Sequence, residues 1–155
     1  MLAVGDSARL EVFFATSYYR GLIIKRPALF TNEADSVRRF RIETEVVINP
    51  DSTFPLVISP YKLNLYRMAD DLEDSMTFEI TNVADMIISL NVIDLADDLM
   101  ELHLDKHLNA GEKIRGVVRL KEAAFDSTFD KSITLGIEGK ENLRFTIPVS
   151  RRIIQ

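Results

Sequence analysis

The chain has two histidines, His103 and His107, and their spacing of four residues is one that zinc sites use. On a helix, this spacing places both imidazoles on one face, where a carboxylate completes the ligand set. Residues 95–107 show no clean helical period, so we expect a loop followed by a short strand, in which the spacing loses that meaning. We therefore expect two partly solvated side chains rather than a metal site. The carboxylates nearby in sequence belong to Asp97, Asp98, Glu101 and Asp105.

A second group of carboxylates lies in the stretch MADDLEDS, at Asp70, Asp71, Glu73 and Asp74. Calcium prefers several oxygen ligands from one loop, and the common calcium loop has a glycine at its centre. This stretch has no glycine, and a solvated connection between two strands accounts for its charge. We expect no metal here and no cofactor in the chain.

Few residues of the chain suit catalysis. The absence of cysteine excludes thiol catalysis, disulfides and cysteine-based zinc sites. The serines, such as Ser59 and Ser89, lack the context of a nucleophile elbow. The six glycines are single and widely spaced, so no phosphate-binding loop is present. We therefore expect that the protein is not an enzyme.

Two adjacent tyrosines, Tyr18 and Tyr19 in the stretch TSYYRG, are the residues best suited to contact a ligand. Aromatic rings combine a large apolar surface with a polar tip, which suits a sugar or a peptide. A carbohydrate- or peptide-binding adhesion module is therefore the alternative function. The basic residues are scattered, and we expect five of them to be solvated: Arg38, Arg39, Arg41, Arg151 and Arg152.

Charge and hydropathy exclude two kinds of partner. The net charge of −5 argues against nucleic acid, whose binding requires a basic face. No apolar run is long enough to cross a bilayer, so we expect no membrane insertion. The first residues, MLAVGDSARLEV, lack a basic segment followed by an apolar one, and we expect no export signal within this chain.

The elements that position these residues are predicted to be strands, because apolar residues recur with a period of two. In the stretch KIRGVVRL, one side holds Ile114, Gly116, Val118 and Leu120, and the stretches MTFEI and RFRIETEV alternate similarly. One apolar side and one polar side are typical of antiparallel strands half-buried in a sheet. Many short strands separated by turn residues predict an all-β sandwich or barrel.

The beginning and the end of the chain resemble each other. LAVGDSARLEVFF at residues 2–14 matches LNAGEKIRGVVRL at residues 108–120, a spacing of 106 residues (108 − 2). Such self-similarity predicts two copies of one three-strand unit, and RFRI and RFTI continue the match one residue out of step. Matched pairs at the spacing of 106 are Gly5 and Gly111, Val12 and Val118, Tyr19 and Phe125, Lys25 and Lys131, and Leu29 and Leu135.

The second copy completes a whole domain. Its strands and those expected before it number about seven in fewer than about a hundred residues, the size of an immunoglobulin-like (Ig-like) sandwich. No such strands precede the first copy within this chain, and we expect the other half of its domain to precede Met1. The predicted organisation is the C-terminal half of an Ig-like domain at residues 1–46, a linker at 47–55, a complete Ig-like sandwich at 56–150 and a tail at 151–155.

Several motifs resemble a known family. In the first copy they are G-[DE]-x5-V at residues 5–12, Gly21, Lys25, Thr31-Asn32 and an alternating strand ending at Val46; in the second, FEITN and RFTIPVSRRI. They resemble a large bacterial family of Ig-like repeats of unknown function, related to sperm-protein-like and cilium-associated Ig-like domains. The family's usual Cys-Gly-Cys-Thr segment has no counterpart here. The resemblance implies tandem repeats in an exported protein, and hence a periplasmic or extracellular location.

The incomplete half-domain is the most informative part of the chain. Three strands cannot bury their apolar face alone, and at about 25 cal/mol per Å² the exposed side chains cost several kcal/mol. The face either folds onto the complete domain, pairs with a second copy in a homodimer, or receives a strand from a protein partner. We favour the homodimer. The candidate interaction surface comprises Leu10, Val12, Phe14, Tyr18, Tyr19, Leu22, Ile24, Phe40 and Ile42.

These observations together favour a non-catalytic structural or protein-interaction module of a tandem Ig-like repeat protein. A sandwich by itself supplies no site, so the function depends on which surfaces the fold leaves uncovered.

Overall fold

The protein is all-β, and its structure is a computed structural model that divides into two units, Met1–Ile48 and Asn49–Gln155. The structure describes residues 7, 10, 12, 14, 16, 18–31, 37–47, 53–68 and 71–154.

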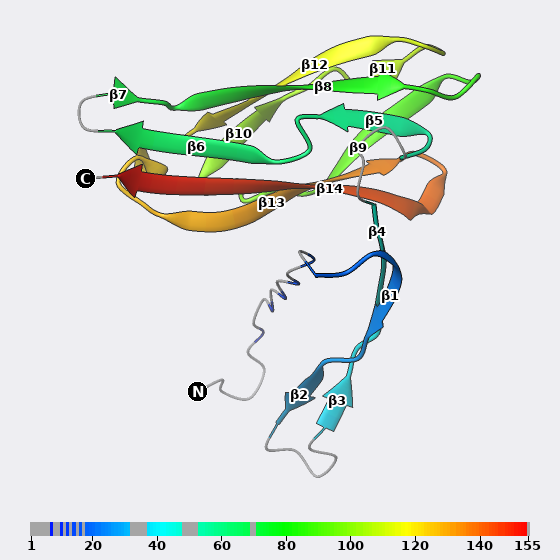
Figure 1. Ribbon diagram of the computed structural model, residues 1–155, viewed down its shortest axis with the longest axis horizontal. Helices are drawn as coiled ribbons and strands as arrows, with labels where there is room; N and C mark the ends of the chain where they lie inside the picture. The colour runs from blue at the N-terminus through cyan, green and yellow to red at the C-terminus, as the bar shows by residue number, and fades with distance from the viewer. Residues whose placement is uncertain are drawn as a thin grey trace. The chain divides into compact units, whose positions relative to one another are not determined.

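The second unit is a sandwich of two sheets (Figure 1). The four-stranded sheet has the order β10-β12-β8-β5 and the six-stranded sheet the order β11-β9-β13-β14-β6-β7. The first sheet contains β5 (Leu56–Ser59), β8 (Ser75–Asn82), β10 (Met100–His103) and β12 (Lys113–Leu120). The second contains β6 (Leu63–Met68), β7 (Asp71–Leu72), β9 (Ile88–Asp94), β11 (His107–Leu108), β13 (Phe129–Ile137) and β14 (Lys140–Ile154).

The strand order is that of an Ig-like sandwich. Strands β5, β8, β12 and β10 follow the order A-B-E-D, and β9, β13 and β14 follow the order C-F-G. All pairs are antiparallel except β6 with β14, which run parallel. The chain thus crosses between β5 and β6 from the edge of one sheet to the other, which joins the two layers.

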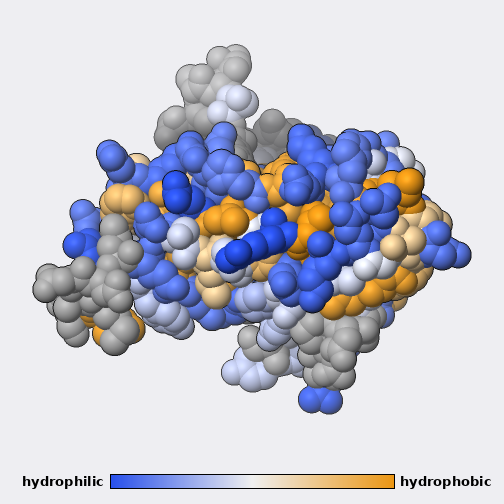
Figure 2. All heavy atoms as spheres, turned by 90° about the horizontal axis from the view of Figure 1, so that it is seen from above, coloured by the Kyte–Doolittle hydropathy of each residue, from blue (hydrophilic) through white to orange (hydrophobic). Residues whose placement is uncertain are grey.

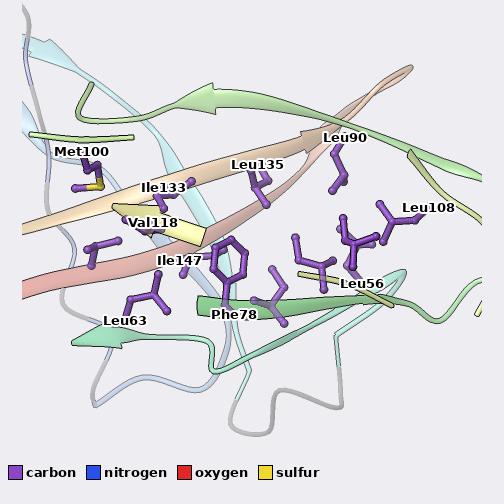
Figure 3. Packing of buried hydrophobic residues seen from close by; sticks show 14 of the residues in the cluster. Leu56, Leu63, Phe78, Leu90, Met100, Leu108, Val118, Ile133, Leu135 and Ile147 are labelled. Carbon is purple, nitrogen blue, oxygen red and sulfur yellow. The ribbon is translucent and has the colours of Figure 1, made fainter. Parts of the chain in front are cut away.

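The core lies between these sheets and is built by the predicted alternation. Along β12, Ile114, Gly116, Val118 and Leu120 are buried, whereas the residues between them are exposed or half-buried. Figure 3 shows side chains from both sheets pointing towards one another, with the ring of Phe78 among them. Each buried Leu, Ile or Phe stabilises the fold by about 1.5–3 kcal/mol relative to an exposed one. The largest fully buried apolar side chains include those of Leu56, Leu63, Phe78, Leu90, Met100, Leu108, Ile133, Leu135 and Ile147.

Gly116 is required by the close approach of a ring. It lies directly opposite Phe78 in the β8–β12 pair. A Cβ atom at position 116 would lie 2.4 Å from Cζ of Phe78, closer than real Cβ contacts. A glycine in the middle of a strand weakens it, so this one is explained by packing.

The end of the chain corrects one expectation. Residues 151–154, predicted to be a tail, are the end of β14. They pair with β6 from Arg151 opposite Leu65 to Ile154 opposite Met68. Pairing with the parallel strand β6 continues the ladder beyond the point at which the alternation of apolar and polar residues in β14 becomes unclear.

The first unit contains an interrupted hairpin of four short strands. β1 (Gly21–Lys25) pairs with β4 (Ile42–Val46), and β2 (Ala28–Phe30) pairs with β3 (Val37–Arg39), both antiparallel. Between the two pairs, the Phe40 N–H donates to the Pro27 carbonyl at 3.1 Å. Because Pro27 has no backbone N–H, it cannot donate the second hydrogen bond of this pair, and the ladder is interrupted here.

The strand expected first in this unit falls only in part on the described residues. Leu10, Val12 and Phe14 are described outside any strand. The matching strand β12 is held by β8 on one side and β10 on the other. Among the described residues of the first unit, no strand lies beside Leu10, Val12 or Phe14, and the residues between these three lie outside the described part of the chain.

The repeat is visible in the structure at its turn and, with a shift, in its hairpin. The Tyr19 N–H donates to the Thr16 carbonyl at 2.9 Å, and the matching Phe125 N–H donates to the Glu122 carbonyl at 3.1 Å. In the hairpins, however, Lys25 lies opposite Ile42, whereas the matching Lys131 lies opposite Val149. The sequence match places Ile42 on Ile147, so the register differs by two residues. A shift of two preserves which side chains share a face.

Candidate functional site

The candidate interaction surface lies in the first unit, and most of it is exposed. Tyr18 is 95% exposed, Leu22 is 64% exposed, and Leu10, Val12, Ile24 and Phe40 are also exposed. Phe14, Tyr19 and Ile42 are half-buried.

The hairpin divides the apolar residues of β1 and β4 between two faces. Leu22 lies opposite Glu45 and Ile24 opposite Glu43, so one face combines two apolar and two acidic side chains. Because opposite residues share a face, Ile42 lies on the other side, across from Lys25. The structure therefore brings Leu22 and Ile24 together but places Ile42 on the opposite face.

The second face carries a small cluster around a lysine. The Nζ atom of Lys25 donates a hydrogen bond of 2.8 Å to the Tyr19 hydroxyl. It also lies 4.3 Å from the centroid of the Tyr19 ring and 5.6 Å from that of Phe14. The two rings lie 5.1 Å apart at an angle of 52°. Aromatic and cation–π contacts of this kind each contribute on the order of 1 kcal/mol, and they account for the half-buried state of Tyr19.

Tyr18 does not take part in this cluster. Within the described part of the chain, the ring contact is between Phe14 and Tyr19. Tyr61 and Tyr66, the other tyrosines, belong to the second unit. Within the described residues of the first unit, Tyr18 therefore makes no ring contact.

Three further apolar residues extend the exposed surface of the first unit and were missed by the sequence reasoning. Phe30 is 76% exposed and lies opposite the exposed Val37 in the β2–β3 pair. Leu29 is 38% exposed, opposite Arg38. The signal available in the sequence is the run ALF directly before the Thr31-Asn32 turn. All three of its residues are apolar, so it lacks the polar residue that an alternating strand would have.

The two histidines lie in different sheets. His103 is on β10 of the four-stranded sheet, with Nε2 at 3.8 Å from Oε2 of Glu101. His107 is on β11 of the six-stranded sheet, with Nδ1 at 3.0 Å from Oγ of Ser89. A search of the described residues finds no group of three His, Asp or Glu side chains able to hold a metal. The prediction of a loop followed by a short strand around them agrees with β10 and β11.

The acidic stretch is described only in part, because Asp70 lies outside the described residues. The carboxylate of Glu73 accepts a hydrogen bond of 3.2 Å from the Tyr66 N–H. This contact joins the turn to β6, which is the structural role expected of a connection between strands.

Arg151 corrects the expectation that all five arginines are solvated. Its side chain is fully buried and follows Ile147 and Val149 on the inward face of β14. It donates to the carbonyls of Glu73 at 3.0 Å and Phe125 at 3.4 Å, and among the described residues its Nε has no hydrogen-bond partner.

Burial lowers the pKa of Arg151, and the nearby positive charge of Arg67 lowers it further, whereas the negative charges of Glu73 and Asp126 raise it. A guanidinium nevertheless stays protonated at neutral pH.

The neighbouring Arg152 is bound at the surface. Its Nη2 donates to both carboxylate oxygens of Asp130 at 2.7 Å. The first-unit arginines Arg38, Arg39 and Arg41 are exposed, as predicted, and Arg41 lies 2.6 Å from Glu43. Exposed pairs of this kind contribute at most about 1 kcal/mol.

Asn82, the last residue of the FEITN motif, holds two loops of the second unit. It is fully buried. Its amide nitrogen donates to the carbonyls of Met86, Leu108 and Asn109 at 2.8, 3.2 and 2.9 Å, and its side-chain oxygen accepts from the Ala84 N–H at 3.0 Å. The motif thus has a structural role, because it satisfies backbone groups that burial would otherwise leave unpaired.

The outer face of the four-stranded sheet is largely polar. Figure 2 shows the molecule from the side of this sheet, with hydrophilic side chains predominating and smaller hydrophobic areas between them. The ion pair between Lys113 and Glu79, 3.0 Å long, lies on this face. A shallow hollow nearby is lined by Ser59, Pro60, Thr77, Phe78, Glu79 and Arg115.

Comparisons with known proteins find some similar solved structures but no matching family. No family model matches the chain, and no curated protein matches it. A protein of unknown function from Porphyromonas gingivalis is similar in structure, with a TM-score of 0.49 and 16% identity over 64% of this chain and 48% of that chain.

Two further solved structures are similar at lower scores. One is the chaperone–tip adhesion subunit pre-assembly complex of Csu pili from Acinetobacter baumannii, with a TM-score of 0.37 and 14% identity over 62% of this chain and 55% of that chain. The other is a secreted serine protease, VesC, from Vibrio cholerae, with a TM-score of 0.34 and 9% identity over 59% of this chain and 21% of that chain. This chain spans about half the length of the first two. In the described residues, no helix has the length and apolar character of a membrane span.

Proposed function

We propose that the chain is a non-catalytic structural or protein-interaction module of a tandem Ig-like repeat protein, and that its first unit is the contact surface. The observation that carries this proposal is the exposure of large apolar side chains on two-stranded sheets. Leu22 and Phe30 are 64% and 76% exposed on β1 and β2. An isolated two-stranded hairpin is marginally stable in water, and three or more strands with a buried face are needed for independent stability.

A covering layer would remove this cost. At about 25 cal/mol per Å² of apolar surface, covering several such side chains contributes several kcal/mol to association. The second unit illustrates the arrangement, since its matching hairpin β13–β14 is buried by a second sheet. The partner is a protein or a second copy of the chain.

The family resemblance of the motifs supports a location outside the bacterial cytoplasm. Gly111 has a φ of +73°, and Glu112 accepts hydrogen bonds of 2.7 and 2.8 Å from the backbone and side-chain amides of Asn109. The Gly-Glu motif therefore closes a turn, which is a reason for these residue types to recur in a repeat family. On the family resemblance alone, we propose a periplasmic or extracellular location.

The competing function is binding of a carbohydrate or a peptide in adhesion. The 95% exposure of Tyr18 favours it, because a stacking contact needs an accessible ring. A sugar-binding platform generally offers more than one ring or a ring with convergent polar groups. Since Tyr18 stands apart from the Phe14–Tyr19 contact, we place this function second.

Hydrogen exchange of this chain at low concentration tests the proposal. We expect the amides of β1 and β4 to exchange far faster than those of β8 and β12, because uncovered hairpins open readily. Slow exchange of β1 and β4 in a monomer of 17.6 kDa would show a self-sufficient unit and overturn the proposal.

Titration with soluble oligosaccharides, followed by tyrosine fluorescence, tests the second function. Saturable binding that is lost in Tyr18→Ala and kept in the control Tyr61→Ala would favour adhesion over the module proposed here.

A further inference from the structure

Matching strands of the two units have different neighbours. β13 lies between β9 and β14, so both of its edges are paired. The matching strand β1 pairs with β4, and within the described residues its other edge meets no strand (Figure 1). In the second unit, β9 adds an antiparallel strand to the edge of β13 at residues 134–137, and the uncovered edge of β1 can accept an antiparallel strand in the same way.

Charge distinguishes the two outer edges of the β1–β4 pair. If β4 paired antiparallel with its own copy around Thr44, Glu43 of one chain would face Glu45 of the other. Like charges directly opposite each other destabilise a pair of strands. β1 has the sequence GLIIK, and pairing around Ile23 places Leu22 opposite Ile24 of the second copy. Aliphatic pairs of this kind stabilise a sheet.

We propose that β1 pairs antiparallel with β1 of a second copy of the chain, centred on Ile23, to give a four-stranded sheet across the dimer. This inference rests on the proposed function, because it names the partner of the exposed first unit. The interface is isologous, as expected of a dimer with twofold symmetry.

The arrangement separates apolar from charged side chains on one face. Leu22 and Ile24 of both copies form the centre of the sheet, and Glu43 and Glu45 lie one strand further out on each side. All five residues of β1 are paired when the centre is Ile23. Arg20 and Arg26 flank β1 and meet across the dimer at both ends, which limits the pairing to this strand. Because these charges are exposed, salt strengthens the dimer by screening them.

Single cysteines test the register, since the native chain contains no cysteine. Opposite residues in an antiparallel pair have Cα atoms about 4.5–5.5 Å apart, within the range that a disulfide spans. Ile23→Cys therefore crosslinks two chains when oxidised with copper phenanthroline. In Leu22→Cys, the two cysteines are diagonal neighbours about 7–8 Å apart and crosslink far less. Equal crosslinking of the two variants would overturn the register.

A charge variant tests the edge itself. In the double variant Leu22→Lys, Ile24→Lys, each lysine faces Glu45 or Glu43 within its own hairpin, so the unit keeps its fold. Across the dimer, the lysines at positions 22 and 24 face each other. We expect the dissociation constant, measured by light scattering over a series of protein concentrations, to rise at least about tenfold.

Phe30→Lys is the matched control, because it removes a more exposed apolar side chain from β2 and leaves β1 intact. We expect its dissociation constant to stay within about twofold of the native value, a difference of well under 1.4 kcal/mol. Equal loss of dimer in both variants would indicate general hydrophobic association and overturn the pairing of β1.

The native chain decides between this inference and the proposed function. A mass of twice 17.6 kDa at high concentration supports the dimer. A monomer at every concentration, with fast exchange in β1 and β4, overturns the dimer and leaves the proposed function standing with a different protein as partner.

Discussion

The hairpins β1–β4 and β13–β14 have matching sequences, and a turn with the same hydrogen bond precedes each of them. The apolar side chains of the first hairpin are nevertheless exposed or half-buried, whereas those of the second are largely buried. Leu29, on the adjacent strand β2, and Leu135, on β13, occupy matching positions, and they are 38% and 0% exposed. β13 and β14 are flanked by β9 and β6, whereas the described residues of the first unit supply β1 and β4 with no such flanking strands. The comparison teaches that alternation marks a face for burial, while the neighbouring strands decide whether burial occurs.

The strongest test of this comparison is truncation of the matched leucines. We expect Leu135→Ala to lower the free energy of unfolding of the second unit by about 2–5 kcal/mol, because it leaves a cavity in the core. Leu29→Ala should cost less than about 1 kcal/mol, since solvent already reaches the side chain. Urea denaturation followed by circular dichroism measures both. Similar costs at the two positions would show that the first unit has a core of its own.

Removal of the buried amide at Asn82 should have the next largest effect. Asn82→Ala leaves the Met86 and Asn109 carbonyls and the Ala84 N–H without their side-chain partner, and we expect a loss of about 2–3 kcal/mol. Asn142→Ala, at an exposed position of β14, is the control and should change stability by less than about 0.5 kcal/mol. If the two variants were equally stable, the loops would not depend on the FEITN motif.

A matched pair of glycines tests how tightly the buried hairpin and its opposite sheet pack. Gly116→Ala places a methyl group against the rigid ring of Phe78, and we expect a cost of about 1–3 kcal/mol. At Gly136, a Cβ would meet the side-chain ends of Asn91 and Ile93, which can move aside, so Gly136→Ala should cost less. Thermal unfolding measures the difference. A larger loss at position 136 would contradict this account.

The smallest expected effect concerns the cluster that stabilises the exposed hairpin. Tyr19→Phe removes the hydrogen bond from Lys25 but keeps the ring, and we expect a loss of about 0.5–1.5 kcal/mol in the first unit. Tyr18→Phe is the control at a 95% exposed position and should leave stability unchanged. Hydrogen exchange of β1 amides reports both. An unchanged exchange rate in Tyr19→Phe would mean that the cluster does not hold the hairpin.

Much of the fold could be predicted, because strands leave a local signal. The alternation in KIRGVVRL coincides with β12, and the expected strand at residues 56–59 is β5. The ends of the strands were harder to predict from the sequence. Residues 151–154 lack the alternation that marks β14 elsewhere, and β6 holds them in the sheet through backbone hydrogen bonds, which leave no trace in side-chain types.

The candidate surface was predicted as a set of residue types but not as a geometry. The apolar positions of the sequence predicted that Leu22, Ile24 and Ile42 share one face, whereas the observed register places Ile42 opposite Lys25. Register depends on the turn and on the whole ladder of hydrogen bonds, neither of which a comparison of two short stretches contains. The buried state of Arg151 was equally hidden, since it arises from carbonyls at residues 73 and 125 that meet at the end of β14.

The residue pattern predicts that the protein is built of strands and where most of them lie, and the match of residues 2–14 with residues 108–120 predicts a repeat. Those features depend on alternation, turn residues and spacing, which are local properties. Which side chains the two hairpins bury, and that a buried arginine lies at the end of the sandwich, became apparent in the folded molecule. Burial depends on segments far apart in the chain, and the same apolar residue is core where a second sheet covers it and surface where none does.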